Sequence, residues 1–401
     1  MTARSSFPSL LGGAAGIHAA DQIAMATLPL TVVIGLGGGA DMVGLLLAVQ
    51  AASWLLCSMP AGVLVDRAPR RTVLLLAAVL GVVGLGLAFA GARLAMVPLL
   101  GLGTCIASGG TVLFVLAAGS VVPDLVGREG LARANARLEM CRAIVTLFAA
   151  PLVGALAAAG WLASGYALAM VAAGLAFLVL TRLPRQAEPP RDTGRPALMA
   201  QLREGAAFVL QQPLLRGIAL CSIFWNMGFF ALMASFVPFA LGRLALDPAR
   251  IGLAQGGLGA GLLMGAALVP WFMRRLGPNA VLLLGPGLSV LAPWLLLIAP
   301  PQGLAIPLAA QFLVGFGPMM WLVCQLSIRQ AVTPRAMLGR VGATIQMAIY
   351  GVRPLGALAG GWLASYSPAM GIALAGALFA ASFGVVLASR LARLRALPAA
   401  A

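Results

Sequence analysis

The sequence predicts an all-α, polytopic membrane protein with twelve transmembrane helices arranged as two six-helix halves. Three observations support this fold class. Of the 401 residues, 61% are hydrophobic and 9% are charged, and the mean hydropathy is +1.02, whereas about 25% of the residues of a soluble domain are charged. The apolar residues form runs of membrane-spanning length, and the arginines between the runs alternate between a rich and a poor side. A soluble protein is therefore excluded.

The apolar runs lie between short polar gaps, and most are near the ~20 residues that a helix needs to cross the hydrocarbon core. Two of them nearly meet at Trp161, so hydropathy alone leaves eleven or thirteen spans open. The predicted spans are 12–35, 42–65, 72–91, 96–119, 139–160, 162–181, 216–240, 251–273, 279–299, 303–326, 341–364 and 369–389.

The distribution of arginine predicts the topology. All 26 basic residues are arginines, and 21 of them fall on one side if the N-terminus is cytoplasmic. Three lie on the opposite side, at Arg93, Arg243 and Arg250, and two lie inside or near spans. The positive-inside rule then places both termini in the cytoplasm and favours an even number of spans. The net charge of +16 is thus a sign of topology in a bacterial-type cytoplasmic (inner) membrane, and not of nucleic-acid binding.

A proline-rich polar stretch at 182–215 separates a half at 1–181 from a half at 216–401. The stretch is predicted to be a cytoplasmic linker. Its second part, residues 197–212, has apolar side chains at three- and four-residue spacing, which predicts a short amphipathic helix on the cytoplasmic surface.

The two halves resemble each other weakly. Residues 151–163 read PLVGALAAAGWLA and residues 354–364 read PLGALAGGWLA, about half of the chain apart. Two parallel copies of six spans are one repeat type of secondary transporters. Coincidence in a sequence rich in Ala, Gly and Leu is the alternative.

A charged motif joins the second and third runs, where residues 62–71 read GVLVDRAPRR. This resembles the G-x-L-x-D-R-x-G-R-R signature of the major facilitator superfamily, with Pro69 in place of the second glycine. A glycine permits close helix approach, and an acidic residue at a helix end can accept donors or face the positive end of another helix. The residues expected to form a cytoplasmic gate are Gly62, Asp66, Arg67, Arg70, Arg71 and Asp124.

Other stretches are similar to one branch of that superfamily, the drug exporters, which include macrolide efflux proteins and enterobactin exporters. They are ADQI at 20–23, VPDLV at 122–126 with ARANA at 132–136, LREGAAFV at 202–209, and GRV at 339–341 with PLG at 354–356. The resemblance covers nearly the whole chain and implies the major facilitator fold and transport by alternating access. Many proton-driven members of the branch carry an arginine in the fourth span, but residues 96–119 contain no charge.

Ionisable residues at membrane depth cost about 2.5–3.5 kcal/mol on insertion scales, so each is a candidate functional residue. Asp21 is the leading candidate for proton or cation coupling, and hydrogen bonding to neighbouring helices is the alternative. His18 lies on the same helical face and is the lone histidine, with simple packing as its alternative role. Glu139 and Arg142 are three residues apart and are expected to pair. Arg353 has three open roles: pairing across the bundle, binding an anionic group of the substrate, or snorkelling to the interface.

The resemblance implies a central substrate cavity lined by spans 1, 4, 7 and 10. Apolar, methionine and aromatic side chains in these spans would accept amphipathic compounds of varied shape, and packing against other helices or lipid is the alternative for each. The candidates are Asp21, Met25, Phe114, Trp225, Asn226, Phe229, Met233, Gln311, Met319, Trp321 and Gln325.

The sequence therefore predicts a monomeric secondary transporter, a multidrug-type antiporter that exports small amphipathic or drug-like compounds in exchange for protons. Export or flipping of a siderophore-like or lipid-like natural product is the alternative. A membrane enzyme or receptor is a remote one, because the chain has no G-K-[S/T] nucleotide loop, H-E-x-x-H site or G-x-S-x-G motif. No cofactor, metal or nucleic-acid partner is expected, and the five cysteines lack metal-ligand spacing.

Overall fold

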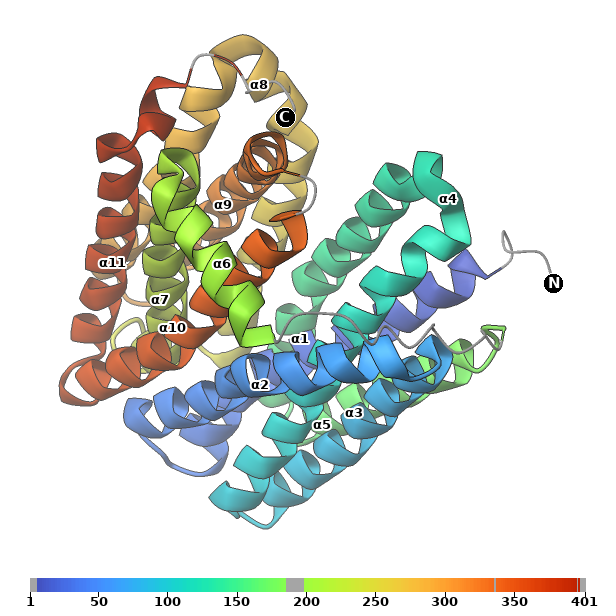
Figure 1. Ribbon diagram of the computed structural model, residues 1–401. Helices are drawn as coiled ribbons and strands as arrows, with labels where there is room; N and C mark the ends of the chain where they lie inside the picture. Colours follow the sequence, from blue (N-terminus) through green and yellow to red (C-terminus); the bar gives the residue numbers. More distant parts are fainter. Residues whose placement is uncertain (1–5, 185–197, 335–336, 395, 397–401) are drawn as a thin grey trace. The chain divides into compact units, whose positions relative to one another are not determined.

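The computed structural model describes residues 6–184, 198–334, 337–394 and 396, and every regular element in these ranges is helical (Figure 1). The elements are α1 (Phe7–Leu30) with a π-helical turn at Thr31–Gly35, α2 (Ala40–Arg67), α3 (Arg70–Arg93), α4 (Val97–Ala158), α5 (Ser164–Leu180), α6 (Leu198–Gln211), α7 (Pro213–Gly242), α8 (Pro248–Ile298), α9 (Ala305–Val332), α10 (Leu338–Tyr366), α11 (Pro368–Ala388) and a 3-10 turn at Arg390–Arg393. The first helix begins at Phe7, five residues before the predicted span.

Two of the helices are each two spans joined end to end. The helical path of α4 is interrupted at Gly127 (φ 67°), and that of α8 at Gly277 (φ 81°). Between the predicted spans at 96–119 and 139–160 the chain stays helical apart from Gly127. Glycine adopts positive φ without a steric cost, so a single residue suffices to redirect the chain.

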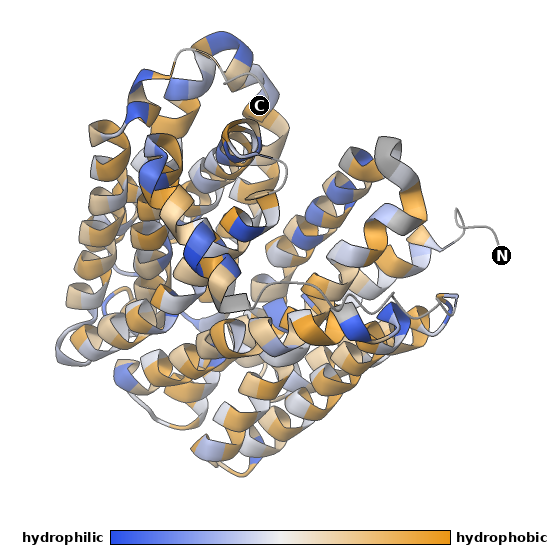
Figure 2. Cartoon of the chain, viewed as in Figure 1, coloured by the Kyte–Doolittle hydropathy of each residue, from blue (hydrophilic) through white to orange (hydrophobic). Residues whose placement is uncertain are grey.

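The helices account for the predicted spans. Nine segments of the described chain are long and apolar enough to cross a membrane, with the 51-residue α8 counted once. The break at Gly277 makes α8 two spans, and the shorter apolar α5 and the arginine-containing α10 bring the total to twelve. Figure 2 shows hydrophobic residues along these helices and alternating hydrophilic and hydrophobic residues on α6.

One compact unit, the N-terminal unit, comprises Met1–Gly39, Val49–Thr193 and Asp247–Leu253. Within it α1 packs on α4 and α5, and α3 packs on the same two helices. Its α3–α4 contact depends on small residues, since a Cβ on Gly84 would meet the Ala107 backbone and lie 2.6 Å from the Gly103 carbonyl oxygen. Helices in lipid associate mainly through such close packing, because the surrounding acyl chains are as apolar as the helix surfaces.

The second compact unit, the C-terminal unit, comprises Ala40–Ala48, Gly194–Leu246 and Ala254–Ala401. Within it α7 packs on α10 and α11. The predicted amphipathic helix is present as α6, which lies against α10 and contributes Val209 to a cluster with Val341 and Ile345. An ion pair of 2.6 Å between Glu204 and Arg340 fixes α6 on α10. Residues 185–197 of the predicted linker lie outside the described chain.

Two helix ends belong to the opposite unit from the rest of their helix. The start of α2 is in the C-terminal unit, where Gly44 and Gly361 approach so closely that a Cβ on either would lie 2.7–2.8 Å from the partner's Cα. The start of α8 is in the N-terminal unit, where Gly252 and Gly154 form the same kind of pair at 2.9 Å. Gly44 and Gly252 are each the fifth residue of their helix. Each of the two helix starts is thus held within its unit by the same kind of glycine contact.

The glycine packing makes a test with a matched control on the same helix. We expect Gly84→Ala to lower the free energy of unfolding by roughly 1–3 kcal/mol, because its Cβ would overlap the α4 backbone. Gly86→Ala is the control, since its Cβ would make an ordinary 3.5 Å contact with the flexible Met170 side chain. Thermal unfolding of the purified proteins in detergent measures both. An unchanged melting temperature for Gly84→Ala would contradict the packing described for α3 and α4.

Candidate functional site

A small cavity about the size of one water molecule lies inside the N-terminal unit. The carboxylate-bearing Asp21 of α1 lines it, with Gln50 of α2 and a row of three hydroxyls on one face of α4 at Thr104, Ser108 and Thr111. The cavity exists because many of the side chains around it are small. The other lining residues are Ile17, Ala20, Ala24, Ala77, Gly81, Leu85, Ala107 and Ala173. The structure therefore places the leading sequence candidate at a small, mostly apolar cavity whose lining includes hydroxyl- and amide-bearing residues that sequence reasoning missed.

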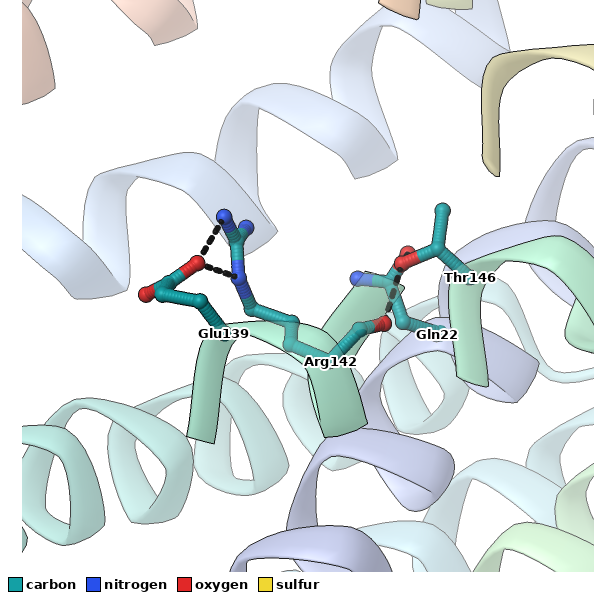
Figure 3. A network of polar contacts seen from close by, with 4 residues as sticks. All are labelled: Gln22, Glu139, Arg142 and Thr146. Carbon is teal, nitrogen blue, oxygen red and sulfur yellow. Dashed lines mark hydrogen bonds and ion pairs between the residues drawn. The ribbon is translucent and has the colours of Figure 1, made fainter. Parts of the chain in front are cut away.

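A chain of polar contacts leads from Asp21 to the second half of α4. Gln22 Nε2 donates to Asp21 Oδ2 at 3.1 Å. The Thr146 hydroxyl donates to the Arg142 carbonyl at 2.9 Å and lies 3.3 Å from Gln22 Oε1, so two acceptors share its hydrogen (Figure 3). The Thr146 hydroxyl thus links the backbone of Arg142 to Gln22, the residue that follows Asp21.

The Glu139–Arg142 pair predicted from spacing is present. Arg142 Nε and Nη2 both donate to Glu139 Oε2, at 3.0 and 2.7 Å (Figure 3). The two side chains are 38% and 51% exposed in the described chain. Exposed pairs of this kind contribute about 0–1 kcal/mol in water, so the pair orients the guanidinium more than it stabilises the helix.

Three further candidates of the N-terminal unit, His18, Phe114 and Met25, do not line the cavity. The His18 ring lies edge-on to Phe114, with centroids 6.2 Å apart and an interplanar angle of 86°. Phe114 is buried in the hydrophobic core of the unit and does not line the cavity. Met25 is half-buried on α1.

The C-terminal unit contains an aromatic cluster on α7. Trp225 and Phe229, which are four residues apart, are stacked with centroids 5.2 Å apart and planes 12° apart. Phe379 of α11 also stacks on Trp225, with ring centroids 5.8 Å apart and planes 29° apart. The indole Nε1 of Trp225 donates to Ser289 Oγ at 2.9 Å, which fixes the ring orientation. The cluster therefore presents fixed, flat π surfaces.

Arg353 of α10 lies beside this cluster. Its Nε donates to Asn226 Oδ1 at 3.0 Å, and Asn226 Nδ2 donates to the Ser222 carbonyl at 2.9 Å, so the amide orientation is set. The guanidinium carbon lies 5.4 Å from the Phe230 ring centroid and 4.8 Å from that of Tyr350. Aromatic faces attract a cation at such distances. The arrangement keeps a charged, planar donor among aromatic rings, which is the chemistry for binding an anionic aromatic group.

The candidates on α9 and Met233 on α7 are buried in the C-terminal unit. Met319 packs closely on Gly265, and Trp321 packs closely on Gly285. Gln311 and Gln325 are buried amides, and within the described chain Gln325 Oε1 has no hydrogen-bond partner. These side chains fill the helix bundle of their own unit.

The predicted gate motif is described in part. Arg71 Nη2 donates to the Thr181 carbonyl at 2.5 Å at the C-terminal end of α5, while Arg67 is exposed and Arg70 half-buried. No described atom lies within 4 Å of the Cβ position at Gly62, so its expected role at the gate stays a prediction. The side chains of Asp66 and Asp124 lie outside the described residues.

No group of three or more metal-ligating side chains occurs among the described residues, and the five cysteines are free thiols, with Cys221 and Cys324 buried.

Comparison with known proteins identifies relatives over most of the chain. The family model of the Major Facilitator Superfamily matches residues 10–357. Enterobactin exporters EntS of Salmonella choleraesuis and Citrobacter koseri are 31% identical over 361 residues, which is 86% of this chain and 81% of theirs. Among solved structures, a variant of the nucleoside transporter NupG superposes with a TM-score of 0.78 at 12% identity, over 96% of this chain and 98% of that one. An inward-facing bacterial homologue of the iron transporter ferroportin gives 0.73 at 15% identity over the same shares. These last two likenesses concern the fold alone.

The contact at Arg71 is tested by a pair of neutral substitutions. We expect Arg71→Met to lower the free energy of unfolding by about 1.5–3 kcal/mol, because a charged donor to the free carbonyl of Thr181 is lost. Arg67→Met is the control, and its exposed position predicts a change within about 0.5 kcal/mol. Thermal unfolding in detergent is the measurement. Equal effects of the two substitutions would show that the α5 contact does not stabilise the unit.

Proposed function

The chain belongs to the major facilitator superfamily, and from this premise we propose that it exports small amphipathic compounds that combine aromatic rings with an acidic group, as siderophore-like natural products do. It is a multi-pass membrane transporter and not an enzyme. The observation that carries the proposal is the position of Arg353 among Asn226, Phe230 and Tyr350.

An acidic aromatic ligand would use both parts of this arrangement. A carboxylate or phenolate accepts charge-assisted hydrogen bonds from the planar guanidinium, and these are about twice as strong as the neutral kind. The aromatic ring of the ligand would stack on the Trp225–Phe229 surface. Efflux of a siderophore-like compound also agrees with the name of the relatives, enterobactin exporter. Neutral or cationic drug-like compounds would use the π surfaces without the ion pair, so we expect weaker binding for them.

We further propose that export is coupled to a proton taken up at Asp21, in an inner membrane with both termini cytoplasmic. A carboxylate at membrane depth is costly when charged and much less so when protonated, and Asp21 lines a small cavity together with Gln50 and three hydroxyl-bearing residues of α4. Asp66 and Arg67 of the motif are proposed to act at the cytoplasmic gate during alternating access. Export driven in this way needs no cofactor.

Replacement of Arg353 tests the substrate class. We expect Arg353→Met to reduce export of a catechol siderophore such as enterobactin by about tenfold or more, which corresponds to the loss of roughly 1.5–3 kcal/mol of charge-assisted hydrogen bonding. Arg353→Lys should retain part of the activity, because it keeps the charge and loses the planar fork. Accumulation of the siderophore in a host lacking its own exporters is the measurement.

The matched control is Arg243→Met, which removes an exposed arginine that also lies near an aromatic ring, 5.8 Å from the Phe239 centroid. Its export should equal that of the wild type. Undiminished export by Arg353→Met, at equal amounts of protein in the membrane, would rule out the proposed substrate contact.

Replacement of Asp21 tests the coupling. We expect Asp21→Asn to abolish substrate-induced proton release from the purified protein, because the amide does not titrate, while substrate binding at the aromatic cluster persists. The control is Asp41→Asn, an exposed carboxylate in the first turn of α2. The proposed coupling role of Asp21 is wrong if the Asp21→Asn variant transports substrate against a gradient as well as the wild type does.

A further inference from the structure

The second half of the chain has a one-sided charge composition. Residues 248–401 contain ten arginines and no aspartate or glutamate. The described part of the C-terminal unit has two carboxylates, Asp41 near the start of α2 and Glu204 on α6, and Glu204 is already paired with Arg340. The other arginines at the end of this unit that is proposed to be cytoplasmic therefore have few acidic side chains available within the unit.

Three of these arginines are brought together by one packing contact. Gly217, near the start of α7, lies against the residues that follow α11, because a Cβ on it would be 3.0 Å from Leu391 Cδ1 and 3.2 Å from Ser389 Cβ. The Leu391 side chain is fully buried, and its N–H donates to Ser389 Oγ at 3.2 Å. These contacts fix the 3-10 turn Arg390–Arg393 beside the start of α7, where Arg216 precedes Gly217 (Figure 1).

Arg216, Arg390 and Arg393, the arginine cluster, are all exposed. Within the described ranges none of the three side chains makes an ion pair or a hydrogen bond to another residue. Three guanidinium groups are thus held at one end of the helix bundle with their donors free. Guanidinium groups bind phosphate through charge-assisted hydrogen bonds that are often bidentate. The cluster is therefore suited to an anion that carries a phosphate group.

The surroundings of the cluster favour a lipid phosphate over a free phosphate ion. Arg216 is the fourth residue of α7, a helix long and apolar enough to cross a membrane, so it lies near the membrane surface. Leu220 is one turn further along the same face and is 41% exposed. The opposite face of α7 carries Ile218, which is buried in the core of the unit. A lipid headgroup at the arginines would place acyl chain over Leu220, whereas a phosphate ion would gain nothing from an exposed leucine.

We infer that the arginine cluster binds the headgroup of an anionic phospholipid. Anionic leaflets attract basic residues that lie at their surface, and here the fold places three such residues on two helix ends that are distant in sequence. The bound lipid would supply negative charge to a unit that has little of its own and would join the start of α7 to the end of α11. None of the three arginines belongs to the proposed substrate or coupling sites, so the lipid site and the export proposal can fail separately.

Lipid binding to the purified full-length protein tests the inference. In neutral detergent, native mass spectrometry should show one dioleoyl-phosphatidylglycerol bound at least tenfold more tightly than dioleoyl-phosphatidylcholine, which has the same acyl chains and no net charge. The anionic lipid should also raise the melting temperature more than the zwitterionic lipid does, because it binds the folded protein more tightly. Equal binding of the two lipids would overturn the inference.

Substitutions locate the site. Arg216→Gln and Arg390→Gln should each weaken phosphatidylglycerol binding about fivefold, and Arg390→Lys should retain most of the affinity because it keeps the charge. The matched control is Arg137→Gln, which removes an exposed arginine of α4 in the N-terminal unit. Because all four positions are exposed or on helix surfaces, the melting temperatures without lipid should equal that of the wild type. An equal loss of lipid binding in Arg137→Gln would indicate general attraction to the membrane and would overturn the site.

A soluble anion is the competing occupant of the arginine cluster. We expect the rise in melting temperature caused by phosphatidylglycerol to be the same in chloride and in phosphate buffer of equal ionic strength and pH, because the acyl chains add to the affinity of the lipid. Loss of this rise in phosphate buffer would assign the cluster to a free phosphate ion and would overturn the lipid site.

Discussion

The absence of water in the hydrocarbon core is the constraint on which the rest of this structure depends. Every backbone N–H and C=O within a span must find its partner inside the segment, and helices provide this. Departures from regular helical structure are therefore small. The described chain redirects α4 and α8 at single glycines, Gly127 and Gly277, and loosens α1 only in the five-residue π-helical turn that ends it. Since lipid removes the hydrophobic drive between helices, packing then depends on small residues that let backbones touch, as at Gly44, Gly84 and their partners.

The same constraint explains why the few membrane-embedded charges are so informative. Asp21 and Arg353 are each surrounded by groups suited to their own charge. Asp21 accepts a hydrogen bond from Gln22 and lines a small cavity with Gln50 and three hydroxyl-bearing residues, whereas Arg353 lies against two aromatic rings and the amide oxygen of Asn226. Each environment supplies partners that lower the cost of burying the charge.

Local patterns in the sequence predicted the features that depend on spacing along one helix. These include the spans, the amphipathic α6, the Glu139–Arg142 pair and the stacked Trp225–Phe229 pair. Features that depend on contacts between distant segments were missed. Gln50 and Ser108 look unremarkable in their own helices and gain meaning only where α2 and α4 meet α1 around one cavity. The surroundings of Gly62 could not be predicted for the same reason, because a motif specifies residues and not the position of a neighbouring helix.

An acidic substrate also changes the energetics of export. Moving one elementary charge across a potential of 100 mV corresponds to about 2.3 kcal/mol. In a cell with a negative interior, an anion released outward from the proposed site at Arg353 would move in the direction that the potential favours, and so would a proton that enters by way of Asp21. Exchange of one for the other moves two charges in the same electrical sense, about 4.6 kcal/mol at 100 mV, whereas a neutral drug would gain only the cation's share. The proposed roles of Asp21 and Arg353 would thus combine the two charge movements that favour export of an acidic compound.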